Sequence, residues 1–74
     1  MDDQLDAEIE ARVLHHFAQN PNASDTAEGV RRWWMPDLAC LGEDVERVLE
    51  SLVASGSLTS RRLADGSVVY ARRA

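Results

Sequence analysis

The pattern of apolar and polar positions predicts three helices followed by two strands. Apolar residues first recur at the spacing of a helix with one face toward a core. After Gly56 the period changes to strict alternation, which is typical of half-buried strands. The sequence Asp65-Gly66 lies within the alternating region and is a strong signal for a hairpin turn. We expect helices over residues 5–19, 26–35 and 43–55, and strands over residues 58–63 and 67–73.

The third helix has the clearest apolar stripe. Its members are separated by three or four residues and form one continuous face, on which we expect Leu49 and Leu52 to be deeply buried. In the first helix the same spacing selects Ile9, Val13, Leu14 and Phe17 as core residues. The loop before the third helix is expected to send Leu38 and Leu41 toward the core. The stripe of the third helix consists of Val45, Val48, Leu49, Leu52 and Val53.

The second helix carries explicit start and stop signals. Asp25 followed three residues later by Glu28 resembles a capping box, with Asp25 as the N-cap. Pro36 ends the helix. Gly29 costs such a helix up to about 1 kcal/mol relative to Ala, unless close packing requires a residue without a side chain.

Three helices followed by a hairpin resemble the winged helix-turn-helix superfamily, over a region from Ile9 to Arg73. The segment 45–58 is similar to the third helix of such domains and its following turn. The resemblance makes Asp65-Gly66 the tip of the wing and Tyr70 the aromatic residue that returns to the core. It implies an α+β fold with residues 1–74 as a single winged-helix domain, in which we expect residues 1–4 to be frayed.

In winged-helix transcription factors the third helix enters the major groove and the wing contacts the DNA backbone or minor groove. The resemblance therefore makes five arginines candidate nucleic-acid contacts: Arg47, Arg61, Arg62, Arg72 and Arg73. The expected recognition surface is nevertheless acidic, because Glu43, Glu46 and Glu50 accompany Arg47 there. Affinity for DNA depends largely on neutralisation of phosphates by basic side chains. We therefore expect no tight binding to duplex DNA at physiological salt, and any binding at low salt should depend on Arg61 and Arg62.

The charge is distributed unevenly along the chain. The net charge is −5, and residues 1–28 hold seven acids against one base. Residues 61–74 instead hold four arginines against the single acid Asp65. This distribution disfavours a DNA-binding helix but leaves a DNA-binding transcriptional regulator that uses the wing as the alternative function.

The two tryptophans of the chain are adjacent and favour a protein-binding surface. A helix directs neighbouring side chains about 100° apart, so Trp33 and Trp34 cannot both point into the core. Tryptophan is enriched at interaction hot spots. The candidate site for a protein partner or a homodimer comprises Trp33, Trp34, Met35, Arg31 and Arg32. The alternative is that both rings cover opposite shoulders of the core.

Other functional classes find little support in the sequence. We expect no catalytic site, metal, cofactor or small-molecule substrate, because no suitable set of nucleophiles, bases or glycine-rich loops is present. His15 and His16 are adjacent on a helix and diverge, so they do not form a metal site, and Cys40 is expected to be an inert, half-buried thiol. The acidic start and the lack of a long apolar run predict a cytoplasmic protein without membrane contact.

Overall fold

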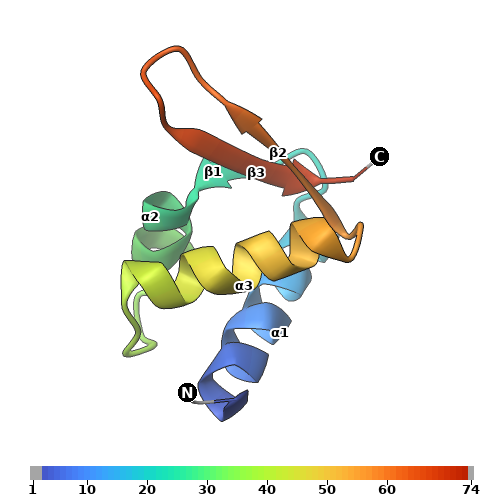
Figure 1. Ribbon diagram of the computed structural model, residues 1–74. Coiled ribbons are helices and arrows are strands. Elements are labelled where there is room, and N and C mark those ends of the chain that lie inside the picture. The colour runs from blue at the N-terminus through green and yellow to red at the C-terminus, as the bar shows by residue number, and fades with distance from the viewer. Residues whose placement is uncertain (1–2, 74) are drawn as a thin grey trace.

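The computed structural model describes residues 3–73 and confirms an α+β fold (Figure 1). α3 lies between α1 on one side and an antiparallel sheet on the other. Residues 1 and 2 of the expected frayed end lie outside the described residues, whereas Asp3 and Gln4 belong to the first helix. The elements are α1 (Asp3–Gln19), β1 (Ser24–Thr26), α2 (Ala27–Gly29), the π-helical segment η1 (Val30–Trp34), α3 (Gly42–Ala54), β2 (Leu58–Arg62) and β3 (Val68–Arg72).

The hairpin of β2 and β3 is joined by a third strand that the sequence pattern did not predict. β3 is the central strand, with β1 and β2 antiparallel on its two sides. Tyr70 of β3 lies opposite Asp25 of β1 and Ser60 of β2. β1 has only three residues, too few for alternation to be recognised, and it exists because it pairs with a strand 45 residues later in the register Asp25↔Tyr70.

Because β1 extends to Thr26, the second helix begins one residue later than the sequence predicted. The N-cap is Thr26, not the predicted Asp25, and its hydroxyl accepts a hydrogen bond from the Gly29 N–H at 3.1 Å. Asp25 instead accepts one from the Thr26 N–H at 2.8 Å. Its carboxylate occupies the space beside Gly29, where a Cβ atom would lie 2.0 Å from Oδ1. Close packing against Asp25 therefore explains the glycine.

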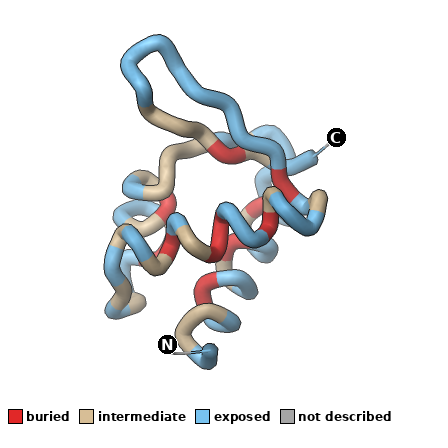
Figure 2. Tube along the Cα trace, viewed as in Figure 1, coloured by how far each residue is buried: buried red, intermediate tan, exposed pale blue. Residues whose placement is uncertain are grey.

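The core forms where α1, η1, α3 and the inner face of the sheet meet, and Figure 2 shows the hairpin tip exposed beyond it. Leu49 is fully buried and Leu52 nearly so, as predicted. Leu38 is partly buried against the core. Among residues 3–73, the buried apolar residues are Ile9, Val13, Phe17, Val30, Met35, Val45, Val48, Leu49, Leu52, Leu58 and Tyr70.

Two leucines that we expected in the core are exposed. Leu14 is 41% exposed because the contacts of α1 follow the row of Ile9, Val13 and Phe17, and the next residue turns away from that row. Leu41 is 61% exposed. It precedes α3 at the N-cap position, where the Asp44 carboxylate accepts a hydrogen bond from its N–H at 2.9 Å. This arrangement fixes the backbone of Leu41 and leaves its side chain in solvent.

Candidate functional site

The two adjacent tryptophans of η1 occupy different environments. Trp33 is 72% exposed, which confirms the expectation that one ring lies at the surface. Trp34 is partly buried and packs on α1. Its ring stacks on His16 with centroids 3.8 Å apart and meets Phe17 edge to face at 4.9 Å. The geometry therefore assigns an anchoring role in the fold to Trp34 and leaves Trp33 available at the surface.

Met35 does not belong to the exposed patch that the sequence predicted. Its side chain is completely buried. The helix ends there, with backbone angles φ −142° and ψ 55° at Met35, and this change of direction turns the side chain back into the core. The apolar part of the candidate partner surface is consequently narrower than expected and centres on Trp33.

Arg31 and Arg32 precede Trp33 in the sequence and share one carboxylate, that of Glu28. Arg31 binds Glu28 through two nitrogens, at 3.2 and 2.8 Å. Arg32 contacts the same carboxylate at 3.1 Å and retains a side chain that is 59% exposed. The hydrogen bonds from Arg31, together with both positive charges, hold the pKa of Glu28 below its ordinary value. The two residues that precede Trp33 thus form one ion-pair cluster with Glu28.

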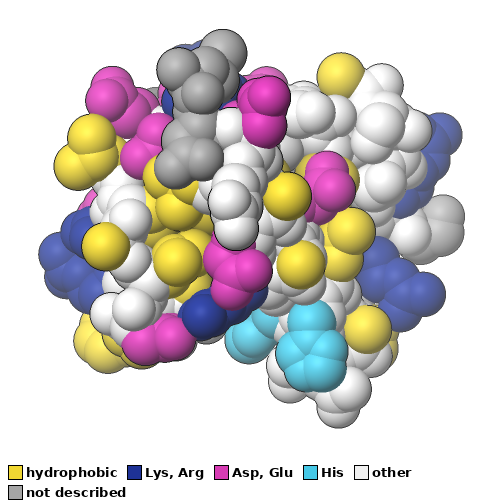
Figure 3. Space-filling view, turned by 90° about the horizontal axis from the view of Figure 1, so that it is seen from below, with side chains coloured by type: hydrophobic (Ala, Val, Ile, Leu, Met, Phe, Trp, Pro, Cys, Tyr) yellow, Lys and Arg dark blue, Asp and Glu magenta, His cyan; other side chains and the backbone are white. Residues whose placement is uncertain are grey.

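A hollow of about 500 Å³ lies where α1 meets Trp34. Both histidines line it and lie side by side on the face shown in Figure 3. His16 is half-buried under the Trp34 ring, as expected of a packed histidine. The residues that line this hollow are Ala11, Arg12, His15, His16, Gln19, Asn20 and Trp34.

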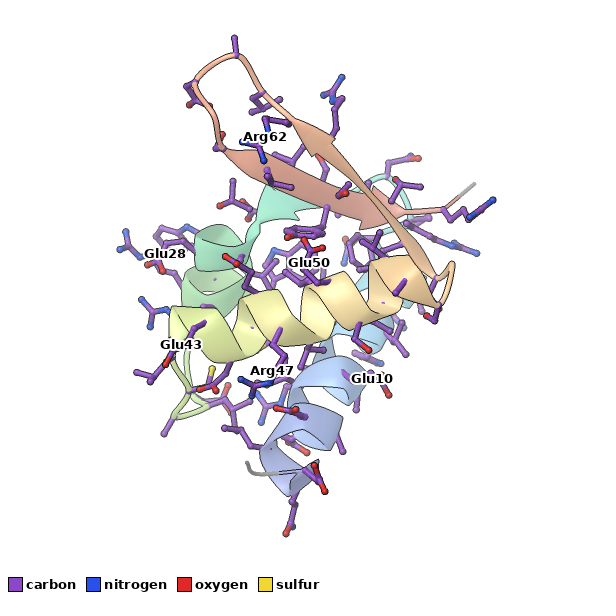
Figure 4. The ribbon with its side chains drawn as sticks, in the orientation of Figure 1. Glu10, Glu28, Glu43, Arg47, Glu50 and Arg62 are labelled. Atoms are coloured by element: carbon purple, nitrogen blue, oxygen red, sulfur yellow. The ribbon has the colours of Figure 1, made fainter. Side chains whose placement is uncertain are left out.

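The surface of α3 does not offer a free base. Arg47 bonds Asp6 of α1 at 2.6 Å and Asp44 of α3 at 3.0 Å. Figure 4 shows Arg47 on the side of α3 toward α1 and Glu50 on the side toward the sheet. Glu50 accepts a hydrogen bond from the Tyr70 hydroxyl. Arg47, a predicted nucleic-acid contact, is therefore already neutralised within the domain.

These contacts change the protonation equilibria of their members. The hydrogen bond from Arg47 holds the pKa of Asp6 below its ordinary value. The pKa of Asp44 is also lowered, first by the Leu41 N–H and then by Arg47. Burial raises the pKa of Tyr70, and the Glu50 carboxylate raises it further. The three pKa shifts favour ionised Asp6 and Asp44 and a protonated Tyr70. These are the protonation states in which the contacts between α1, α3 and the sheet form.

The four arginines of the hairpin region differ from the other arginines in their ion pairing. Within residues 3–73, each arginine before the hairpin forms an ion pair with a carboxylate. The hairpin arginines form none among these residues, and all of them are exposed. The unpaired set is Arg61, Arg62, Arg72 and Arg73.

Cys40 is half-buried, as predicted. Burial raises the pKa of its thiol, and the nearby Asp44 carboxylate raises it further. The group is therefore in its thiol form at neutral pH, the less nucleophilic state. Within residues 3–73 no group of three or more histidine, cysteine or carboxylate side chains is placed to hold a metal ion.

Several ion pairs and one hydrogen bond were not predicted from the sequence. The pairs Glu28–Arg31 and Asp44–Arg47 follow helical i, i+3 spacing, so charge spacing alone could have predicted them. Asp6 and Arg47 are 41 residues apart, and no local signal joins them. The same applies to the bond between Tyr70 and Glu50, which depends on how the sheet lies on α3.

None of the helices described over residues 3–73 is both long and apolar enough to cross a membrane. Comparison with known proteins found no matching family model, curated protein or solved structure. The function is therefore argued from the residues themselves.

Proposed function

We propose that this chain is a cytoplasmic winged-helix module without catalytic activity, and that it binds a protein partner through Trp33. The observation that supports the proposal is the 72% exposure of a tryptophan whose neighbour, Trp34, is held in ring contacts with α1. A large aromatic ring left in water gains more from burial by a partner than any other side chain on this surface.

The surroundings of Trp33 suit an interaction anchor. Arg32 is exposed beside it in the sequence, and Glu28 holds Arg31 and Arg32 in place. Exposed apolar residues rimmed by charged groups mark many protein interfaces, and tryptophan and arginine are the residue types most enriched at their hot spots. Because Met35 is buried, we propose a small contact with one dominant anchor.

The test compares Trp33→Ala with Leu14→Ala, a matched removal of an exposed apolar side chain from α1. Sedimentation at increasing protein concentration measures self-association, and pull-down from the native host measures capture of other proteins. We expect Trp33→Ala to abolish association while its melting temperature stays close to that of the wild type. Association that survives in Trp33→Ala, or that falls equally in Leu14→Ala, would contradict the proposal.

The alternative function is DNA binding by the wing in a transcriptional regulator. Four exposed hairpin arginines without carboxylate partners support it. The surface of α3 argues against a conventional reading of the major groove, because Arg47 is bound by two carboxylates while Glu43 and Glu46 remain exposed. DNA binding in this alternative depends on the hairpin arginines alone.

A further inference from the structure

The outer face of the sheet, which turns away from α3, carries two adjoining hollows that no acid lines. Their volumes are about 290 and 440 Å³, and both include Asn22 and Ala71. We name them together the outer trough. The first is lined by Asn22, Ser24, Thr59, Ser60, Arg61, Val69 and Ala71, and the second by Pro21, Asn22, Ala23, Ala71, Arg72 and Arg73.

The strand register separates Arg61 from its neighbour Arg62. Side chains alternate between the two faces of a strand, whereas paired residues on adjacent strands share a face. Arg62 pairs with Val68, which packs against the core from the inner face. Arg61 pairs with Val69 and therefore lies on the outer face, where it lines the trough.

The lining of the outer trough is suited to an anion. A guanidinium group stands at the hairpin end, contributed by Arg61, and Arg73 lines the other hollow. Arg72 also borders that hollow, but it pairs with the buried Leu58, so its side chain belongs to the inner face. Between them, the hydroxyls of Ser24 and Thr59 are free to donate, because neither makes a side-chain hydrogen bond within residues 3–73. Arginine together with hydroxyl donors is a common means of contacting phosphate oxygens. In a chain with 13 acids and 8 bases, a trough to which Arg61 and Arg73 contribute and that no carboxylate lines is a marked departure from the average surface.

We propose that the outer trough binds the phosphodiester backbone of duplex nucleic acid. Arginines in both adjoining hollows match successive phosphates better than a single phosphate group. No aromatic side chain lines the trough to stack on a base, and α3 lies against the opposite face of the sheet. The contacts are therefore confined to phosphates, and binding is independent of base sequence. This inference rests on the alternative function above, DNA binding by the wing, and defines the face that the duplex contacts.

Arg61 and Arg62 of β2 provide the test, because they carry the same charge but lie on opposite faces of the sheet. Fluorescence anisotropy is measured with two labelled short duplexes of unrelated sequence at about 50 mM salt, where phosphate contacts are strong. Arg61→Ala is expected to weaken binding about tenfold and to reduce the slope of log K against log salt by about one. Arg62→Ala is expected to change the affinity by less than about twofold, and the two duplexes should bind equally.

Four outcomes would overturn the assignment of the outer trough to duplex binding. Equal losses in the two variants would show that the duplex does not discriminate between the faces. Absence of wild-type binding would remove the inference and the DNA-binding alternative together, whereas strong binding that ignores Arg61 would remove only the trough. Tripolyphosphate bound through Arg61 without any duplex binding would identify a small-anion site instead. Trp33→Ala should leave duplex binding unchanged, so the proposal of a protein partner is tested independently of the outer trough.

Discussion

Arg47 on α3 and Arg61 on β2 are both candidate nucleic-acid contacts by sequence, but the fold surrounds them differently. Arg47 lies between the carboxylates of Asp6 and Asp44. Arg61 lies on the outer face of the sheet beside hydroxyl groups and without a carboxylate partner. The same residue type therefore stabilises the helical part of the domain and remains available in the hairpin. Charge counted along a sequence does not measure charge available at a surface.

The helical part of the domain and the hairpin also differ in how many buried residues they contribute. Most of the buried apolar residues come from α1, η1 and α3, whereas β2 contributes only Leu58 and the residues after it are exposed. Leu63, the residue that follows β2, is 37% exposed. The helical part should therefore determine the stability of the domain, while substitutions in the outer hairpin should alter binding with little effect on folding. The following substitutions test that division.

The largest effect is expected for truncation of a core leucine. Leu52→Ala removes a nearly buried side chain and leaves a cavity, which should lower the free energy of unfolding by about 2–5 kcal/mol. Leu63→Ala is the matched control in the hairpin and should cost less than about 1 kcal/mol. Urea denaturation of the two variants gives both values. Similar losses would show that the hairpin is as important to stability as α3.

A smaller effect is expected where the two parts meet. Tyr70→Phe removes the hydroxyl that donates to Glu50 and should cost about 1 kcal/mol, since Glu50 is exposed and water replaces the lost donor. The ring itself remains buried. Thermal unfolding at neutral pH measures the difference, and a Tyr70→Phe variant as stable as the wild type would mean that the hydrogen bond adds nothing.

The same substitution has a pH signature. Burial and Glu50 raise the pKa of Tyr70 above its ordinary value of about 10, so the folded state retains the phenol proton more strongly than the unfolded chain. This stabilisation is complete below about pH 10 and is lost as the pH rises further. The wild type should therefore lose stability above pH 10 more steeply than Tyr70→Phe. Parallel alkaline profiles would exclude a contribution from the Tyr70 proton.

Sequence pattern was sufficient for the elements that depend on nearby residues. The stripe of α3 and the Asp65-Gly66 turn were placed within one residue of their observed positions, because helical spacing and turn chemistry are local properties. β1 was missed because its three residues form a strand only beside β3. Leu14 and Met35 were misassigned because their burial depends on the side from which neighbouring elements approach.

For the candidate sites, the sequence predicted which types of residue would be exposed but not which individual residue or which face of the sheet. Adjacent tryptophans required one of the rings to be exposed, but the choice of Trp33 follows from the stack of Trp34 on His16 of α1. The basic character of the hairpin was visible in the sequence. Its division into an outer face with Arg61 and an inner face with Arg62 requires the strand register, which the alternation of residues 58–63 alone does not fix.

The smallest expected effect is the most direct test of the contrast between Arg47 and Arg61. Arg47→Met keeps an apolar stem but removes the guanidinium that lowers the pKa of Asp6 and Asp44. A carboxyl whose pKa is lower in the folded state adds stability above its unfolded pKa of about 4, and that stability is lost as the pH falls through the folded pKa. The melting temperature of Arg47→Met should therefore lie below that of the wild type at pH 7.

This difference should narrow once the pH falls below about 4, because protonation of the two aspartates then removes the ion pairs from the wild type as well. Arg61→Met is the matched control: its guanidinium has no carboxylate partner among the described residues, so its melting curve should follow the wild type throughout the range. The melting temperatures of the three proteins are compared by circular dichroism from pH 7 to about pH 3. If Arg61→Met shows the same pH-dependent deficit as Arg47→Met, the hairpin arginine is also engaged in the fold, and it is not free to meet a ligand.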